Sequence, residues 1–358
     1  MSFNKKNMIR IGVSLVIGVL LLIVLLWWTG IDEIIEQISS VSPLWLAVSA
    51  LVIVPAYAVK ALRWKLLLKP VKNGIHVSNA FWSTALGSMV NTLIPVRIGE
   101  FARAYVLGEK EKTGFAPAFS SIIVERTLDL IGLLTIGVAT MLIVSTQTSL
   151  DQLVANIFTA VALLIIAILA VIVVGTKKEA SIIKIVAQVT SKIPFVKKYS
   201  ARIAEFASSL IKGLQGLSQN PRMLAVNFSL TWAAWLVHTS AIYFVFMAFN
   251  YPISIAAATL GGTLMSLSHI LPATPGYVGS YEAFWVLIFT MLGVTEMDVL
   301  LSIGLISHII GALPVVAVGC MSVIWLGVSF EEIFSFKKYN ETHNTEHGKL
   351  EANRRKLQ

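Results

Sequence analysis

The hydrophobic residues of this chain fall into long blocks, and polar residues concentrate in the segments between them. A helix needs about 20 mostly apolar residues to cross the hydrocarbon core of a bilayer, and six blocks are of that order. They cover residues 11–28, 44–62, 119–144, 154–174, 224–249 and 299–328. This pattern predicts an all-α integral membrane protein with six transmembrane helices.

The first block needs a separate decision, because a basic start followed by an apolar run is also typical of a cleavable signal peptide. The core of a signal peptide has about 7 to 15 apolar residues and ends in small residues. Residues 11–28 form a longer run that ends in Trp27 and Trp28, which are typical interfacial anchors. We therefore expect this block to be retained as the first helix.

Two further apolar stretches, residues 77–107 and 254–292, are interrupted near their middle. Proline and glycine within residues 95–99 and 272–279 would end or kink a helix there. We interpret each stretch as a re-entrant helical hairpin that returns to the side it left. Because the two hairpins would enter from opposite sides of the membrane, we expect an inverted repeat, a plan that recurs in transporters.

The composition agrees with a membrane protein, since 56% of the residues are hydrophobic and 13% are charged, against about 25% charged in soluble domains. The four predicted outer loops, residues 29–42, 145–153, 250–253 and 293–298, contain acidic residues but no Lys or Arg. The positive-inside rule then places both termini in the cytoplasm. The net charge of +9 follows from this asymmetry, so we expect a multi-pass protein of the cell (plasma) membrane and no nucleic-acid partner.

The predicted organisation is one polytopic membrane domain, residues 1–330, followed by a disordered cytoplasmic tail, residues 331–358. Residues 177–222 form a basic, amphipathic cytoplasmic segment within the membrane domain. This segment either contacts anionic headgroups of the inner leaflet or is an ordinary positive-inside loop, and both interpretations stay open.

The first interruption carries charged side chains inside an apolar stretch. A broken helix leaves backbone groups that lipid cannot satisfy, so the break should border a protein cavity. Arg97 or Arg103 could bind a phosphate there, Glu100 could orient either guanidinium, and Gly99 would let a headgroup approach the backbone. The alternative is a Glu–Arg pair that only neutralises itself near the inner surface.

The next span carries Glu125, Arg126 and Asp129 in its first part. Glu125 and Asp129 lie four residues apart on one helical face and need a cation nearby. We expect Arg97 or Arg103 to supply it, in a cluster that binds a headgroup or titrates. A plain salt network at the cytoplasmic end is the alternative.

The second interruption has its own polar residues in apolar surroundings. We expect Glu282 to carry a proton, with His269 as a relay, because both can titrate near neutrality at a buried site. His238 and His308 are expected to be interhelical hydrogen-bond partners. The remaining candidates around this break, which include residues that allow a close approach to the backbone, are Pro275, Gly276, Gly279 and Tyr281.

The inner end of the second span carries Tyr57, Lys60 and Arg63. Side chains of this kind often lie along the apolar surface and place their polar tips at the interface. We therefore expect these three residues to snorkel rather than to bind a ligand.

Three motifs in order carry a resemblance to a known family: NTLIPVRIGEFARAY at residues 91–105, ERTLD at 125–129 and LPATPGYVGSYE at 271–282. Over about residues 5–330 the chain resembles the lysylphosphatidylglycerol synthase transmembrane-domain family, which includes the flippase half of the bacterial multiple peptide resistance factor and stand-alone relatives. The resemblance implies translocation of a lipid headgroup. It places the following residues around the pathway: Arg97, Gly99, Glu100, Arg103, Glu125, Arg126, Asp129, Pro275, Gly276, Gly279 and Glu282.

Two-domain members of that family carry a soluble aminoacyl-transferase after the membrane part, whereas this sequence continues only into the polar residues 331–358. Lysine transfer to lipid is therefore not expected. The sequence favours a non-enzymatic lipid translocase for a phosphate-bearing headgroup, on a phospholipid or a polyprenyl-phosphate-linked lipid, with no cofactor, metal or catalytic residue.

Two other functions stay open. One is a membrane enzyme that modifies a lipid-linked substrate, although the chain has no recognisable metal-binding, nucleotide-binding or nucleophile motif. The other is a non-catalytic membrane partner of a lipid synthase or glycosyltransferase. The expected ligand is a membrane lipid with an anionic headgroup, and homo-oligomer formation is left open.

Overall fold

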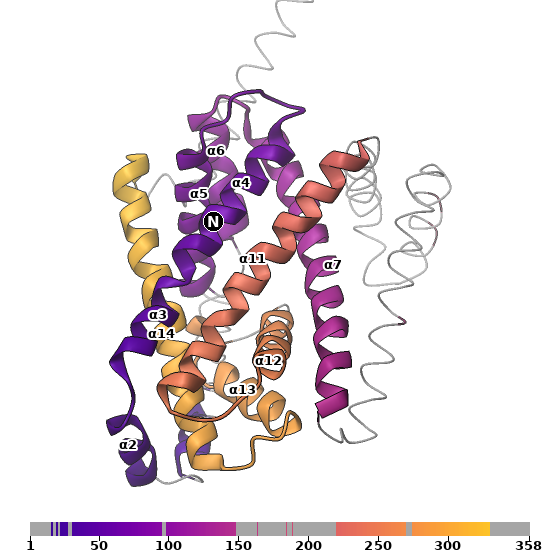
Figure 1. Ribbon diagram of the computed structural model, residues 1–358. Helices are drawn as coiled ribbons and strands as arrows, with labels where there is room; N and C mark the ends of the chain where they lie inside the picture. Colours follow the sequence, from indigo (N-terminus) through magenta and orange to yellow (C-terminus); the bar gives the residue numbers. More distant parts are fainter. Residues whose placement is uncertain are drawn as a thin grey trace, which may run out of the picture.

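The computed structural model describes residues 31–94, 98–147, 220–269 and 274–329, together with residues 16, 19, 20, 22–27, 163, 184 and 188. Every regular element in this part of the chain is helical. The elements are α2 (Ile31–Ser39), α3 (Pro43–Leu51), α4 (Ile53–Leu68), α5 (Val77–Leu93), α6 (Gly99–Lys110), α7 (Phe115–Gln147), α11 (Pro221–Ala248), α12 (Ile255–Ser268), the 3₁₀ helix η2 (Pro275–Tyr277), α13 (Ser280–Met291) and α14 (Met297–Leu326) (Figure 1).

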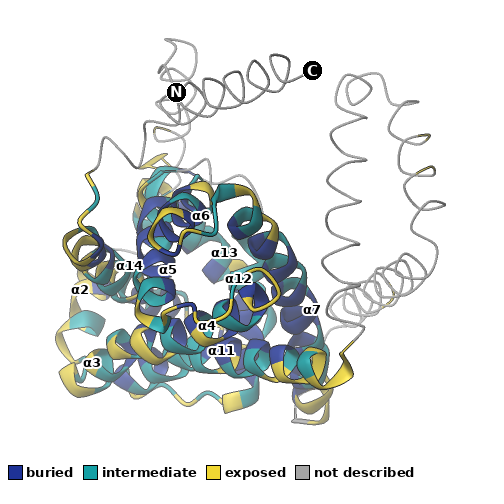
Figure 2. Cartoon of the chain, turned by 90° about the horizontal axis from the view of Figure 1, so that it is seen from above, coloured by how far each residue is buried: buried dark blue, intermediate teal, exposed yellow. Residues whose placement is uncertain are grey.

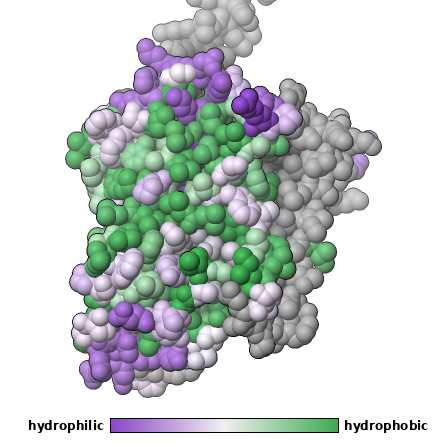
Figure 3. Space-filling model, viewed as in Figure 1, coloured by the Kyte–Doolittle hydropathy of each residue, from purple (hydrophilic) through white to green (hydrophobic). Residues whose placement is uncertain are grey.

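Within the described residues, four helical segments are long and apolar enough to cross a membrane: Pro43–Leu68, Phe115–Thr146, Pro221–Ala248 and Met297–Leu326. They coincide with four of the six predicted spans and confirm those as helices. Of the other two predicted spans, residues 11–28 are described at 16, 19, 20 and 22–27, all of them helical, and residues 154–174 are described only at 163. Figure 3 shows a broad apolar band between two more hydrophilic ends of the molecule, as a bilayer-embedded surface requires.

Both predicted interruptions fall between helices. α5 ends at Leu93 and α6 begins at Gly99, and Ile94 between them is extended, with φ −120° and ψ 120°, as expected before a proline. α12 ends at Ser268 and α13 begins at Ser280, with only the short η2 between them in the described chain. Residues 95–97 and 270–273 lie outside the described residues, so the helix ends are established and the connecting backbone is not.

The same order of helices occurs twice. A long span of 26 or 28 residues is followed by a shorter helix of 17 or 14, an interruption, a helix of 12, and a long helix of 33 or 30. We call these the first unit, α3 to α7, and the second unit, α11 to α14. Figure 1 places α5 and α6 toward the upper end and α12 and α13 toward the lower end.

The two units are packed together through several helices and do not form separate domains. α14 of the second unit lies along α5 of the first, and α11 packs on α3, α4 and α7. Each unit has its own apolar core, with Trp64 and Leu107 buried in the first, and Trp285 and Phe289 buried in the second. Seen from above, the buried residues face a shared interior (Figure 2), which is where the polar candidates lie.

Glycine permits the closest helix contact of the first unit. A Cβ atom on Gly99 would lie 1.9 Å from the carbonyl oxygen of Gly87 and 2.6 Å from Asn91 Oδ1. No side chain fits at that separation, so α5 and α6 can meet at this point only because position 99 is glycine. The described contact of Gly99 is with the chain's own helix α5, and its expected role in the approach of a headgroup stays a prediction.

Candidate functional site

The candidate residues within the described chain form two groups. We call Arg63, Glu100, Arg103, Glu125, Arg126 and Asp129 the ionic cluster, and we call the space between the two helix interruptions the histidine cavity. Arg97 lies outside the described residues.

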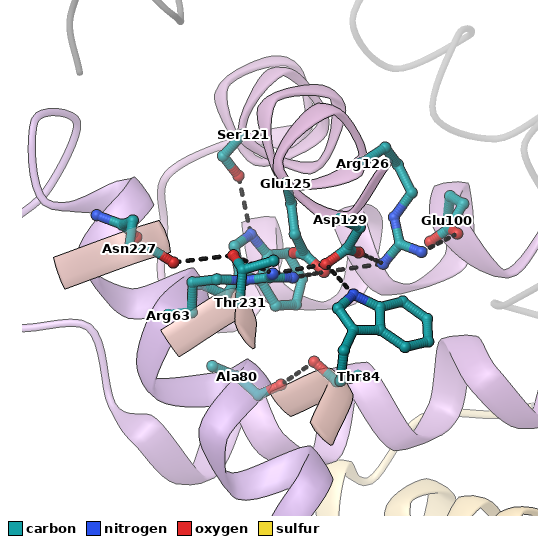
Figure 4. Close-up of polar contacts among 12 residues, drawn as sticks. Arg63, Ala80, Thr84, Glu100, Ser121, Glu125, Arg126, Asp129, Asn227 and Thr231 are labelled. Carbon is teal, nitrogen blue, oxygen red and sulfur yellow. Dashed lines mark hydrogen bonds and ion pairs between the residues drawn. The ribbon is translucent and has the colours of Figure 1, made fainter. Parts of the chain in front are cut away.

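Glu125 on α7 is the centre of the ionic cluster (Figure 4). Its Oε1 atom lies 3.1 Å from Arg63 Nη2, 3.2 Å from Arg103 Nη1 and 2.9 Å from Arg126 Nη2. The carboxylate is fully buried. Three guanidinium groups thus replace the water that a buried carboxylate would otherwise need, and they come from α4, α6 and α7.

Asp129, one turn along the same face of α7, ties the cluster to α11. It accepts a hydrogen bond from Arg63 Nη1 and one from Trp235 Nε1 at 3.0 Å, and it lies 3.2 Å from Arg126 Nη2. Arg63 also donates to Thr231 Oγ1 at 2.8 Å. The charged cluster therefore joins the second unit to the first in addition to the apolar core.

Glu100 lies in the first turn of α6 and closes the cluster on its more open side. Arg103 Nε donates to Glu100 Oε2 at 2.9 Å, and Arg126 Nη1 lies 3.8 Å from Glu100 Oε1. The expected orientation of Arg103 by Glu100, and the expected supply of a cation to Glu125 from the neighbouring hairpin, are both present. Three arginines balance three carboxylates, so the cluster as a whole is formally neutral.

The arginines differ in how far a ligand could reach them. The side chains of Arg63 and Arg103 are 0% and 3% exposed, whereas that of Arg126 is 41% exposed. Arg103 is further covered by the ring of Trp64, 4.8 Å from its guanidinium carbon. Among the described arginines of the cluster, Arg126 has the most exposed side chain.

Arg63 is the member of the cluster that sequence reasoning missed. We expected it to snorkel to the interface, and it is instead completely buried with two acidic partners. The signal was the unbalanced pair of carboxylates on α7, but the sequence does not tell which helix packs against them. Lys60, one turn earlier, does not reach a carboxylate in the described contacts and lies 4.6 Å above the ring of Trp235.

The histidine cavity has a volume of about 300 Å³ and is bordered by residues that precede the first interruption and by residues on both sides of the second. Asn91 and Thr92 precede the first interruption, and His269 and Tyr277 flank the second. The cavity thus lies next to the helix breaks. Such a position is expected, because unsatisfied backbone groups at a break are costly in contact with lipid. Other polar lining residues are Ser88, His238, Tyr281 and His308.

Glu282 pairs with His308 on α14 rather than with His269. His308 Nδ1 lies 2.7 Å from Glu282 Oε1, and His308 Nε2 lies 2.9 Å from the carbonyl oxygen of Gly276. His308 is therefore an interhelical hydrogen-bond partner, as predicted, and it also takes the position expected for the relay. His269 Nδ1 bonds within its own helix to the carbonyl oxygen of Met265 at 2.6 Å.

The first amide groups of the two 12-residue helices already have partners. Gly99 N–H donates to Asn91 Oδ1 at 2.8 Å, and Gly279 N–H donates to Glu282 Oε2 at 2.7 Å. Free N–H groups at the start of a helix can bind a phosphate. At these two positions the protein's own side chains occupy the amides instead.

The backbone of the second interruption is strained in a way that the sequence partly indicates. Gly276, Tyr277 and Gly279 all have positive φ angles, of 63°, 60° and 75°. Glycine adopts this conformation freely, but a bulky residue such as tyrosine does so at a cost and only where surrounding contacts hold it. Pro275 opens this segment as the first residue of η2.

The chain has been compared with known families and proteins. The family model described as lysylphosphatidylglycerol synthase TM region matches residues 15–319, which include all described helices of both units except the last residues of α14. No solved structure matches the chain significantly.

Several archaeal proteins are similar to this chain over most of its length. A UPF0104 membrane protein of Methanothermobacter thermautotrophicus is 26% identical over 89% of this chain and 95% of its own length. The UPF0104 membrane protein MJ1595 of Methanocaldococcus jannaschii is 22% identical, over 81% and 87%. The glycosyltransferase AglD of Haloferax volcanii is 22% identical over 90% of this chain, which corresponds to 55% of AglD. With its apolar spanning helices and a family match over most of its length, the chain is an integral membrane protein that belongs to the lysylphosphatidylglycerol synthase TM region family.

Proposed function

We propose that this protein is a lipid translocase that moves a phosphate-bearing headgroup, on a phospholipid or a polyprenyl-phosphate-linked lipid, between the leaflets of the cell membrane without chemical change. The observation that carries the proposal is the cavity near both helix interruptions, which Ser, Thr, Asn, His and Tyr side chains line together with apolar ones. A polar cavity of this kind is costly inside a membrane protein unless it is used, and its volume of about 300 Å³ is at the lower end for small-ligand sites.

The architecture that we propose for this activity is six crossings, two opposed re-entrant hairpins and cytoplasmic termini. The repeated helix order and the placement of α5 with α6 and of α12 with α13 at opposite ends support an inverted repeat. In such a repeat, rocking of one unit against the other opens a central site alternately to each side. The acyl or prenyl tails would stay in lipid while the headgroup crosses.

Within this mechanism the ionic cluster would attract the phosphate. Arg126 has the most exposed side chain of the three arginines, and the planar fork of an arginine matches two phosphate oxygens. Glu100 and Asp129 would hold that side chain in place before the lipid arrives. Arg63 and Arg103, which are buried and paired, would position the carboxylates rather than contact the lipid.

The test is reconstitution of the purified protein into phosphatidylcholine vesicles that contain either fluorescent phosphatidylglycerol or a fluorescent short-chain polyprenyl phosphate. We expect faster movement of at least one lipid than in empty vesicles. The Arg126→Gln variant should reduce that rate at least tenfold, while Lys69→Gln, which removes one exposed positive charge outside the cluster, should leave it unchanged. Wild-type rates equal to those of empty vesicles for both lipids would contradict the proposal.

A second function, membrane partner of a glycosyltransferase, has one specific observation in its favour. This chain corresponds to 55% of the protein named glycosyltransferase AglD, so a similar membrane part occurs there together with additional chain. A partner without transport activity should tolerate Arg126→Gln in cells, whereas a translocase should not. A modified lipid product formed by the purified protein would instead favour an enzyme.

A further inference from the structure

We propose that Glu282 and His308 together bind one exchangeable proton and that lipid movement by this protein is coupled to that proton. This inference rests on the proposed translocase function and adds its energy source. It is carried by the geometry of the pair, by its place in the repeated architecture and by the strained backbone that it holds.

Counting hydrogens around His308 fixes how many protons the pair holds. The carbonyl oxygen of Gly276 can only accept, so His308 Nε2, 2.9 Å away, must carry a hydrogen. Glu282 Oε2 accepts from the amide of Gly279 at 2.7 Å. The remaining contact, His308 Nδ1 to Glu282 Oε1 at 2.7 Å, requires one hydrogen between the two atoms, because two lone pairs would repel at that distance.

That shared proton decides the charge of the pair. With it, the pair is either a neutral acid beside a neutral imidazole or a carboxylate beside an imidazolium, and both forms have no net charge. Without it, the pair carries one negative charge in a buried position, since Glu282 is 2% exposed. Adding a second proton would place two hydrogens face to face. The observed geometry therefore corresponds to exactly one proton, which is bound or released as a unit.

His308 lines the histidine cavity, so a proton released by the pair would enter that cavity. The titratable groups that face this space are His238 on α11, His269 on α12, Tyr277 on η2 and Tyr281 on α13. Among the described lining residues, no Lys, Arg, Asp or Glu is present to neutralise the deprotonated pair. A lipid-linked charge that enters or leaves the cavity would therefore act directly on its protonation.

The first unit contains the same arrangement with a different base. His308 and Arg126 each lie eleven residues after the first residue of their long helix, α14 and α7. Each faces a glutamate in the first turn of the preceding 12-residue helix, Glu282 or Glu100. Arginine stays charged at any relevant pH, whereas histidine exchanges its proton near neutrality. The pair in the second unit, Glu282 with His308, can therefore exchange a proton, whereas Arg126 in the pair of the first unit stays charged.

Release of the proton would also loosen the interruption itself. His308 holds two points of the segment, the Gly276 carbonyl and the Glu282 carboxylate, and Tyr277 between them is in a strained conformation. Strain of this kind persists only while its contacts last. Deprotonation removes one of the two contacts, and the segment that borders the cavity can then move.

The first measurement is the pH-dependent infrared difference spectrum of the protein in nanodiscs, which reports carboxyl and imidazole protonation. We expect a one-proton step in the wild type that is lost in Glu282→Gln and equally in His308→Arg. The double variant should lose no further step. The control variant Glu296→Gln removes a carboxylate that accepts a hydrogen bond from Tyr251. It should retain the one-proton step. Separate losses in the two single variants would show independent groups and overturn the shared proton.

The second measurement uses the reconstituted vesicles with fluorescent phosphatidylglycerol and an imposed gradient of one pH unit. For one proton per lipid, the wild type should hold a distribution between leaflets of up to about tenfold asymmetry. Glu282→Gln, whose amide can donate to His308 Nδ1, and His308→Arg should both give an equal distribution. Wild-type movement that ignores the gradient would overturn the coupling and leave the translocase standing, whereas no movement of any lipid would overturn both.

Discussion

Glu125 offers the sharpest test of the ionic cluster, because a single change unbalances three buried ion pairs. Glu125→Gln keeps the size of the side chain and removes its charge. Arg63 and Arg103 would stay in place with side chains 0% and 3% exposed, and Glu100 and Asp129 would have to balance three arginines. The cluster, which is formally neutral in the wild type, would then carry one excess positive charge.

The expected destabilisation follows from the burial of these groups. Removing one partner of a buried ion pair costs about 3–5 kcal/mol, because the remaining charge keeps its desolvation penalty. Arg126 is 41% exposed and can recover part of its hydration, so we expect a value near the lower end, about 3 kcal/mol. That corresponds to about a 100-fold change in the ratio of folded to unfolded protein.

The assay is unfolding of the purified protein in mixed micelles, followed by tryptophan fluorescence. Glu125→Gln should unfold at clearly lower denaturant than the wild type, and the exposed control Glu296→Gln should not differ. The double variant Glu125→Gln/Arg126→Gln restores the balance of charge and should recover part of the loss. A Glu125→Gln protein as stable as the wild type would refute the view that the cluster is buried and mutually neutralised.

Two further predictions concern packing and pH. Gly99→Ala should prevent α5 and α6 from packing together, because its Cβ would overlap the Gly87 carbonyl oxygen. In the control Gly137→Ala the Cβ would meet Thr263 at an ordinary 3.5 Å. Only the control should behave like the wild type in size-exclusion chromatography. Burial of Glu111 alone would raise its pKa, but hydrogen bonds from Asn79 and other neighbours lower the pKa below its ordinary value. Its contribution to stability is therefore complete above the ordinary glutamate pKa of about 4.3 and is lost as the pH falls through the lowered value. The difference in melting temperature between the wild type and Glu111→Gln should be constant from neutral pH to about pH 5 and should disappear in stronger acid; a difference that grows in acid would contradict this sign.

Much of the fold follows from the sequence because a bilayer restricts what a chain can do. Apolar length alone located four spans within a few residues at most ends, and Pro and Gly located both interruptions. The principal error at a helix end was the second span, predicted to end at residue 62, whereas α4 continues to Leu68. Its last turns contain charged residues, which hydropathy penalises, but Arg63 has buried partners that make those turns stable.

The candidate site was less predictable, because its chemistry depends on contacts between distant helices. The sequence indicated the pairs within one helix, such as Glu100 with Arg103, since a separation of three residues places both on one face. It could not indicate that Arg63 meets Asp129 or that His308 meets Glu282, because each of these contacts is set by how two helices of the same unit pack.

Differences between corresponding residues of the two units explain why the repeat is hard to recognise in the sequence. The short match around Pro95 and Pro272 suggested a repeat, but the paired residues that follow differ in type and spacing. Glu100 is the second residue of α6 and Glu282 the third of α13, and their partners are an arginine and a histidine. The copy with an arginine keeps its ion pairs at any relevant pH, and the copy with a histidine can change its net charge by exchanging a proton. If both belong to one translocase, the proton gradient sets the direction of net lipid movement, and the unit with the exchangeable proton is the one that responds to that gradient.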